Sequence, residues 1–185
     1  MITKPQALNK LSELMKSGNL IKHCLAVEAA MCAYAEYFDI SNDEQQKWAI
    51  AGLLHDADYE KFPQEHPQVI IQWLREQNAN KELINAVAAH GFCFNIAAET
   101  LMAKTLRAVD ELTGLIVAVA LVRPNKKLSE VSVESVLNKW NSTSFAAGVN
   151  RDDIERGAKE INVPLKEHIS IVLEAMQGIS DKLGL

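Results

Sequence analysis

The residues most able to do chemistry in this sequence are histidines and aspartates in its first 110 positions. His55 and Asp56 are adjacent at the end of the apolar stretch AGLLHD, so they place a nitrogen and an oxygen ligand at one point in space. Imidazole with carboxylate suits divalent transition metals such as Mn, Fe, Co, Ni or Zn, and some mixed sites also admit Mg. The dipeptide alone is a weak signal, because it is expected by chance in many proteins.

Asp110 lies in the long apolar segment LMAKTLRAVDELTGLIVAVALV, on the same helical face as Leu106 and Val117. A carboxylate buried on such a face without a partner costs several kcal/mol. Lys104 and Arg107 lie about one turn away on the same helix, but both can reach water instead. A metal ion shared by several helices is therefore the simpler explanation for this carboxylate.

Four of the five histidines lie in the first half of the chain. His23 and His90 each lie on the apolar face of a predicted helix, where a lone histidine is more often a satisfied core residue than a ligand. His66 stands directly before a proline at a predicted helix start and, taken alone, could be a cap or a surface residue. His168 follows Glu167 in a polar C-terminal helix, so we expect it to be exposed to solvent and assign it no role.

The segments that position these residues have the apolar period of a helix, and no stretch shows the alternation or the Asn-Gly turns of a β-hairpin. The expected fold class is all-α. Thr3 with Gln6 and Ser41 with Glu44 are typical of capping boxes, and Asn80 of a further helix cap. Helices are expected from residue 3 onward and over about 20–38, 41–56, 67–77, 80–91, 96–122, 133–140, 151–161 and 164–177.

The clearest internal boundary is Arg123-Pro124-Asn125, because a proline disfavours helix at its own position and at the preceding one. We expect residues 1–122 to form a helical core that carries the metal site. Residues 123–185 are expected to form a C-terminal helical extension packed on that core. Trp140 and Phe145, together with the apolar C-terminal helices, could support a homodimer.

The composition argues against several classes of partner. A net charge of −5 over 185 residues is unlike a binder of nucleic-acid polymers, which usually shows a basic face. The longest apolar run, Leu115 to Val122, is far shorter than a membrane span, and the charged N-terminus has no apolar signal segment. Cys24, Cys32 and Cys93 form no CxxC pattern and are typical of reduced thiols. We therefore expect a cytoplasmic protein with no membrane or nucleic-acid partner.

The order of the candidate ligands carries more information than any one of them. His23, then His55-Asp56, then Asp110, all at helical positions, resembles the H…HD…D signature of the HD superfamily of metal-dependent phosphohydrolases, over about residues 18–122. The segment EHP before a helix and the segment AAHG also match. AVDELTGLIVAVALVRP and FAAGVNRDDIERGAKEINVPLKEHI look like a subgroup of uncharacterised predicted HD hydrolases, which extends the resemblance to nearly the whole chain.

The resemblance implies an HD-domain helical bundle and a definite set of metal ligands. Four residues would bind one divalent ion, namely His23, His55, Asp56 and Asp110. In two-metal relatives the aspartate of the HD pair bridges, and the positions that match His66 and His90 hold the second ion. One ion and two ions are both compatible with the sequence. With one ion, the last two histidines would bind phosphate or protons.

Three residues near the predicted metal site are candidates for catalysis: Asp58, Lys61 and Glu65. Many relatives read HDIGK where this chain reads HDADYEK, so Lys61 does not align with the relatives' lysine. Asp58, Glu60 and Glu65 are additional acids that could transfer protons or could be loop surface.

The resemblance implies metal-assisted hydrolysis of a phosphoester by metal-activated water. The enzyme would be a phosphomonoesterase or a nucleotide or cyclic-nucleotide phosphodiesterase, and its partner a small phosphorylated molecule such as a nucleotide. Two alternatives stay open. One is a di-iron oxygenase, because that ligand set also occurs in oxygenases of the superfamily. The other is a non-catalytic sensor that binds a metal or a nucleotide.

Overall fold

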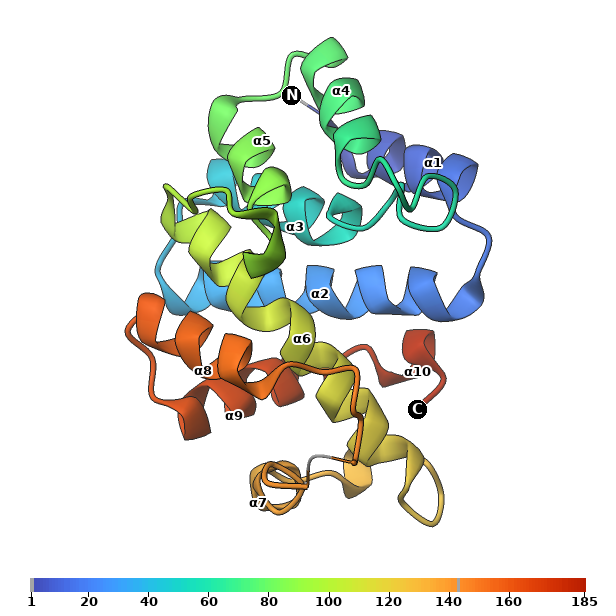
Figure 1. The fold of residues 1–185 in the computed structure, drawn as a ribbon, viewed down its shortest axis with the longest axis vertical. Coiled ribbons are helices and arrows are strands. Elements are labelled where there is room, and N and C mark those ends of the chain that lie inside the picture. The colour runs from blue at the N-terminus through green and yellow to red at the C-terminus, as the bar shows by residue number, and fades with distance from the viewer. Residues whose placement is uncertain (1, 143) are drawn as a thin grey trace.

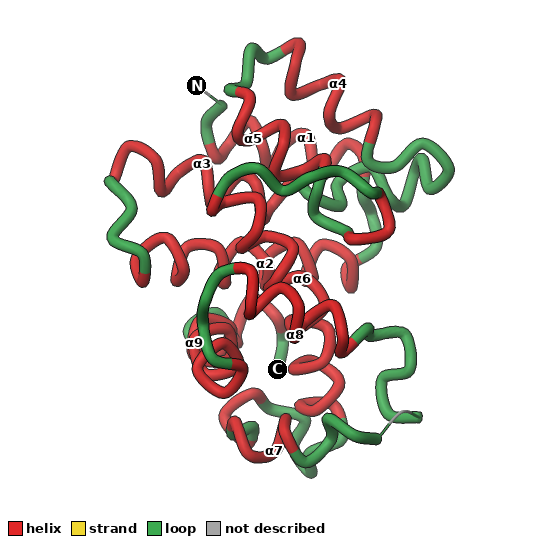
Figure 2. Tube along the Cα trace, turned by 60° about the vertical axis from the view of Figure 1, so that its left-hand side comes forward, coloured by secondary structure: helices red, strands yellow, loops and turns green. Residues whose placement is uncertain are grey.

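The computed structural model describes residues 2–142 and 144–185, and over these ranges it contains helices joined by loops and no strand (Figures 1 and 2). The predicted all-α class is confirmed. The α-helices are α1 (Lys4–Leu14), α2 (Gly18–Tyr37), α3 (Asn42–Leu54), α4 (Gln68–Glu76), α5 (Lys81–Ala88), α6 (Leu101–Leu121), α7 (Val133–Leu137), α8 (Arg151–Glu160), α9 (Leu165–Gln177) and α10 (Ser180–Leu183). Two short 3-10 helices are η1 (Phe92–Phe94) and η2 (Leu128–Glu130).

Local capping explains where several helices begin. Thr3 and Gln6 form the predicted capping box at the start of α1, and the Asn80 side chain accepts from the backbone of the first turn of α5. The capping box predicted at Ser41 is wrong, because its side chain makes no capping hydrogen bond and Glu44 pairs with a lysine instead. The helix predicted from residue 96 begins later, at Leu101, since Thr100 supplies its N-cap.

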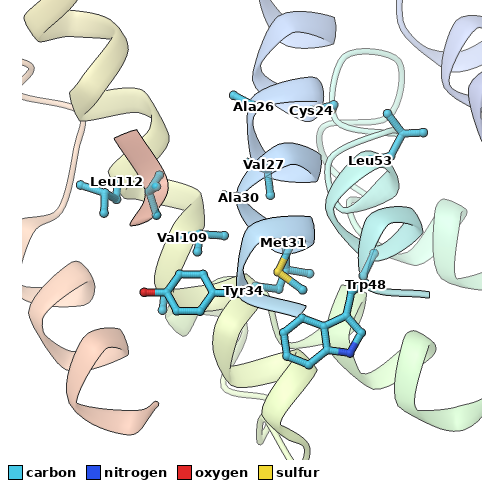
Figure 3. Close-up of a cluster of buried hydrophobic side chains, with 14 of the residues drawn as sticks. Cys24, Ala26, Val27, Ala30, Met31, Tyr34, Trp48, Leu53, Val109 and Leu112 are labelled. Carbon is cyan, nitrogen blue, oxygen red and sulfur yellow. The ribbon is translucent and has the colours of Figure 1, made fainter. Parts of the chain in front are cut away.

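Helix α2 crosses the middle of the molecule, with α1, α3, α4 and α5 on one side and α8 and α9 on the other (Figure 1). Its buried side chains lie between Cys24 and Ala35, and Figure 3 shows Val27, Met31 and Tyr34 packed among residues of α3 and α6. Helix α6 crosses α2 and is buried on nearly all sides. This apolar core fixes the helices that position the candidate ligands.

Helices α2 and α3 approach so closely that only a glycine fits between them at residue 52. A Cβ atom on Gly52 would lie 2.8 Å from the backbone N and Cα of Glu28, which is closer than real Cβ contacts. His55 follows Gly52 by three residues, about one helical turn. The close packing at Gly52 therefore sets the position of the HD pair relative to α2.

The C-terminal helices share one continuous apolar core with the first 122 residues. Helix α8 packs against α6 at Gly157, where a Cβ atom would lie 2.6 Å from the Cα atom of Ala108. The division of the chain at residue 122 stays a prediction. No helix of the described residues is both long enough and apolar enough to cross a membrane.

The prediction that His168 is exposed is wrong. Its side chain is fully buried between α2 and α6, because α9 turns an apolar face that includes Ile169 and Val172 into the core. His168 Nε2 donates to the carbonyl of Ala108 over 3.0 Å, and Nδ1 accepts from the Tyr34 hydroxyl. Burial lowers the pKa of His168 to about 4, so the ring is neutral.

Candidate metal centre

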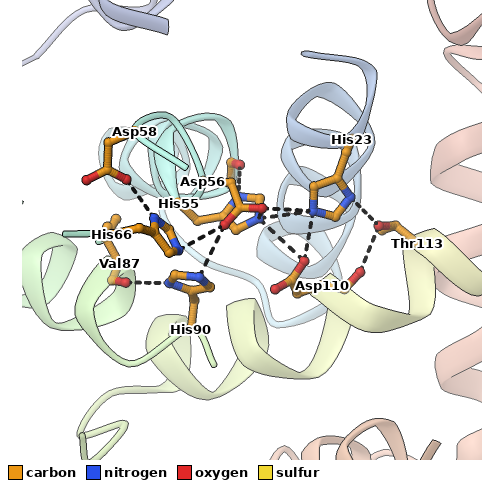
Figure 4. Close-up of polar contacts among 10 residues, drawn as sticks. His23, His55, Asp56, Asp58, His66, Val87, His90, Asp110 and Thr113 are labelled. Atoms are coloured by element: carbon orange, nitrogen blue, oxygen red, sulfur yellow. Dashed lines mark hydrogen bonds and ion pairs between the residues drawn. The ribbon is translucent and has the colours of Figure 1, made fainter. Parts of the chain in front are cut away.

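Six predicted metal ligands from five different parts of the chain meet at one place (Figure 4). Their positions follow from where helices end, since the HD pair directly follows α3 and His90 follows α5. His23 projects from α2 and Asp110 from α6, while His66 lies in the loop before α4. They form two groups, which are His23 with His55 and Asp110, and Asp56 with His66 and His90.

The first group brings two imidazoles and a carboxylate together. His23 Nε2 lies 3.2 Å from His55 Nε2, and Asp110 Oδ1 lies 2.9 Å from the former and 3.4 Å from the latter. Two ligands of one transition-metal ion, each bound at about 2.0–2.2 Å, stand roughly 3–3.5 Å apart. The spacing of the three atoms therefore fits a shared ion.

The second group is joined to the first by the carboxylate of Asp56. Its Oδ1 lies 3.3 Å from His66 Nε2 and 3.4 Å from His90 Nε2. Its Oδ2 lies 3.6 Å from the Nε2 atoms of both His23 and His55. The two oxygens of one carboxylate thus face two different pairs of imidazoles, and each group can hold its own ion.

The rings are oriented by acceptors behind them. His55 Nδ1 lies 2.8 Å from the carbonyl oxygen of Gly52, and His90 Nδ1 lies 2.6 Å from that of Val87. A carbonyl oxygen only accepts, so each Nδ1 carries the proton and each Nε2 faces the cluster. This is the arrangement that metal-binding histidines usually show.

Asp58, which we predicted as a catalytic residue, lies behind His66. Its Oδ1 accepts from His66 Nδ1 over 2.6 Å, and its Oδ2 accepts from the backbone N–H of Ile70 over 2.9 Å. Its side chain is fully buried. Both oxygens are occupied, so the carboxylate orients the ring and does not face the opening of the cluster.

Thr113 orients His23 in a similar way, and the sequence analysis missed it. Its hydroxyl donates to the carbonyl oxygen of Asp110 over 2.8 Å and stands 3.3 Å from His23 Nδ1, from which it can accept. The signal that could have revealed it is spacing, because Thr113 follows Asp110 by three residues and shares its helix face.

The other two predicted catalytic residues lie outside the cluster. The side chains of Lys61 and Glu65 are exposed, and neither makes a hydrogen bond or an ion pair with the candidate ligands among the described residues. Glu65 lines a different surface hollow beside Trp73. Their placement gives no support to a catalytic role, because the loop directs His66 inward and leaves Lys61 and Glu65 exposed.

The charges of the cluster are suited to a cation. Burial lowers the pKa of His55, but the carboxylates of Asp56 and Asp110 outweigh burial and raise it to about 9. Burial raises the pKa of both carboxyl groups, yet the facing imidazoles, His55 above all, hold them below the usual range. Two ionised carboxylates thus lie among four imidazoles. A divalent cation could supply positive charge here and bind the Nε2 atoms in place of protons.

The six candidate ligands differ in their exposure to solvent. The side chains of His23, Asp56 and Asp110 are between 19 and 24 % exposed, whereas those of the other three candidate ligands are at most 7 % exposed. The accessible part of the cluster is therefore formed by His23, Asp56 and Asp110.

Comparison with models of protein families matches residues 20–115 to the HD domain, which covers every candidate ligand. The chain therefore belongs to the HD domain family, a family of metal-dependent hydrolases, and the predicted membership of the HD superfamily is confirmed. Searches of curated proteins and of solved structures gave no match.

Proposed function

We propose that this protein is a metal-dependent phosphohydrolase that uses two divalent ions to cleave a small phosphorylated substrate. His23, His55 and Asp110 would hold one ion, His66 and His90 the other, and Asp56 would bind both. The proposal is supported above all by the position of the Asp56 carboxylate. Each of its two oxygens faces a different pair of imidazoles, at 3.3–3.6 Å.

Divalent ions held in this way supply Lewis acidity, a nucleophile from bound water and neutralisation of phosphoryl charge. In the reaction a bond forms between the oxygen of water and phosphorus, the bond from phosphorus to the alcohol oxygen breaks, and that oxygen takes up a proton. The protein's own part is to fix the ligands. The acceptors behind His55, His66 and His90 keep each Nε2 aimed at the cluster, so no ring has to reorient during the reaction.

Asp58 is proposed to act as a positioning residue for His66. A buried carboxylate that accepts from Nδ1 makes the ring more basic and holds its plane. This role replaces the catalytic one that we predicted from the sequence. The proton transferred to the leaving alcohol would then come from solvent or from a group of the cluster on its open side.

The test is hydrolysis of a panel of phosphomonoesters, nucleotides and cyclic nucleotides with added Mn²⁺ or Mg²⁺, followed by release of inorganic phosphate or, for the cyclic nucleotides, by formation of the nucleoside monophosphate. We expect turnover by the unaltered chain and its loss in Asp56→Ala. The matched control Glu65→Ala also removes an acid close in sequence, but from an exposed position outside the cluster, and should retain turnover.

Two outcomes would overturn the proposal in different ways. Bound iron with oxygen uptake and no phosphate release would favour the di-iron oxygenase. Bound metal without turnover of any panel member would favour the sensor.

A further inference from the structure

We propose that a cavity beside His23 receives the organic part of the substrate, and that the substrate is a phosphoester of an alcohol bearing an apolar ring. This inference rests on the proposed phosphohydrolase function and adds the class of leaving group. It concerns a region that lies outside the ligand cluster but shares a wall with it.

The cavity has a volume of about 380 Å³ and lies between α2, α6 and residues 183–185. In Figure 1, α10 stands beside the first half of α2 and the last half of α6. Most of the lining is apolar, and the residues that supply it are Ala26, Val117, Leu121, Leu183 and Leu185. Asn19 and Lys22 add two polar side chains.

His23 and Thr113 join the cavity to the metal centre. Both residues line the cavity. His23 also faces Asp110 at 2.9 Å through its Nε2 atom, and Thr113 stands behind the same ring. One imidazole therefore separates the cavity from the place where the phosphoryl group would bind. The His23 side chain is 24 % exposed, and a substrate that binds in both regions would pass over this ring.

The size and lining of the cavity select the leaving group. An apolar cavity of about 150 Å³ holds one benzene ring, so this one has room for a ring with its linking atoms. Apolar walls favour a substrate that removes apolar surface from water, at about 25 cal/mol per Å². A short polyol phosphate would leave the cavity unfilled and would gain nothing from it.

The test compares 2-phenylethyl phosphate with ethyl phosphate, because both release a primary alcohol and differ mainly in the ring. With Mn²⁺ we expect kcat/KM to be at least about tenfold higher for 2-phenylethyl phosphate, the usual effect of filling an apolar pocket. Val117→Trp fills the cavity from a partly exposed position and should bring the ratio of the two kcat/KM values close to one.

Two further variants keep the test interpretable. Leu121→Trp fills the same cavity from a side chain that is 48 % exposed, so it can replace Val117→Trp if that variant does not fold. Val122→Trp makes the same kind of change one residue outside the lining and should preserve the preference.

The results separate this inference from the function on which it rests. If both esters are cleaved at equal kcat/KM, or if the cavity-filling variants keep the preference, the inference is wrong and the phosphohydrolase function stands. If neither ester nor any member of the broader panel is hydrolysed, the proposed function is wrong and this inference falls with it.

Discussion

Buried histidines occur in two regions of this molecule, and they differ in how their nitrogens are used. At the candidate metal centre, His55 donates a hydrogen bond from Nδ1 to a backbone carbonyl oxygen, and its Nε2 faces the carboxylates of Asp56 and Asp110. Between α2, α6 and α9, His168 uses both nitrogens on uncharged groups of Tyr34 and Ala108. The pKa is raised to about 9 in the first case and lowered to about 4 in the second.

The contrast separates a candidate ligand from a structural histidine better than burial does. Both rings are fully buried. What differs is whether a ring nitrogen is left facing negative charge, where a cation binds, or is satisfied by a neutral partner. Substitutions at the candidate ligands and their partners should therefore change metal binding, whereas substitution of His168 should change stability.

The largest effect is expected at Asp110, which contacts only the first group. Asp110→Asn removes a charged ligand, so we expect metal content to fall from about two ions per chain to about one. Phosphoester turnover should fall by at least about a hundredfold, because several kcal/mol of charge stabilisation depend on that ion. Elemental analysis and a phosphate-release assay check this. Glu111→Gln, the adjacent acid that contacts Asn150 instead, should change neither; equal losses in both variants would contradict the ligand assignment.

His168→Leu should affect stability and not metal content. The folded-state pKa of about 4 lies below the ordinary value of 6.5, so the unfolded chain binds more protons between these values. The contribution of His168 is therefore complete above pH 6.5 and is lost as pH falls towards 4, by roughly 3 kcal/mol in the free energy of unfolding.

Urea unfolding at several pH values tests this by difference. The leucine variant should be less stable near neutral pH, by roughly 1–3 kcal/mol for the hydrogen-bonding groups left unsatisfied. It should lose less stability than the unaltered chain between pH 6.5 and 4. Identical pH profiles would contradict the lowered pKa of His168. A loss of bound metal would contradict its purely structural role.

Asp58→Asn should weaken metal binding at the second group only. The change removes the charge behind His66, and loss of such a partner usually lowers metal affinity by about 10–100-fold. Metal titration that resolves the two sites would measure it. Glu65→Gln, an exposed acid next to His66 in sequence, is the matched control. An unchanged second site would mean that Asp58 does not position the ring.

The smallest effect is expected from Thr113→Val, which removes the hydroxyl behind His23. The contact is long, at 3.3 Å, so we expect no more than about a tenfold loss of affinity, confined to the first ion. Thr105→Val is matched to it, since Thr105 is buried on the same helix and bonds only to the carbonyl of Leu101. If the two changes reduce metal affinity equally, the loss is due to altered packing and not to the hydroxyl behind His23.

The sequence predicted the all-α fold and the residues that converge on the centre. The order of the histidines and aspartates along the chain can be recognised without knowing how the helices pack. It misjudged single residues in their surroundings. His168 follows Glu167 and was expected at the surface, yet the apolar face of α9 carries it into the core. Asp58 is a candidate for proton transfer or for loop surface from the sequence, and the turn that follows α3 places it behind His66. His168 is placed by contacts with residues distant in sequence, and Asp58 by contacts across a turn; local patterns record neither.

The central claim is that one carboxylate, Asp56, joins two metal sites. The most direct measurement is the metal content of the purified chain after loading with Mn²⁺ and removal of the excess, compared with Asp56→Ala and with the control Glu65→Ala. We expect about two ions per chain in the unaltered protein and in the control, and at most one weakly held ion in Asp56→Ala. The same low metal content in all three proteins, or two ions retained by Asp56→Ala, would contradict the claim.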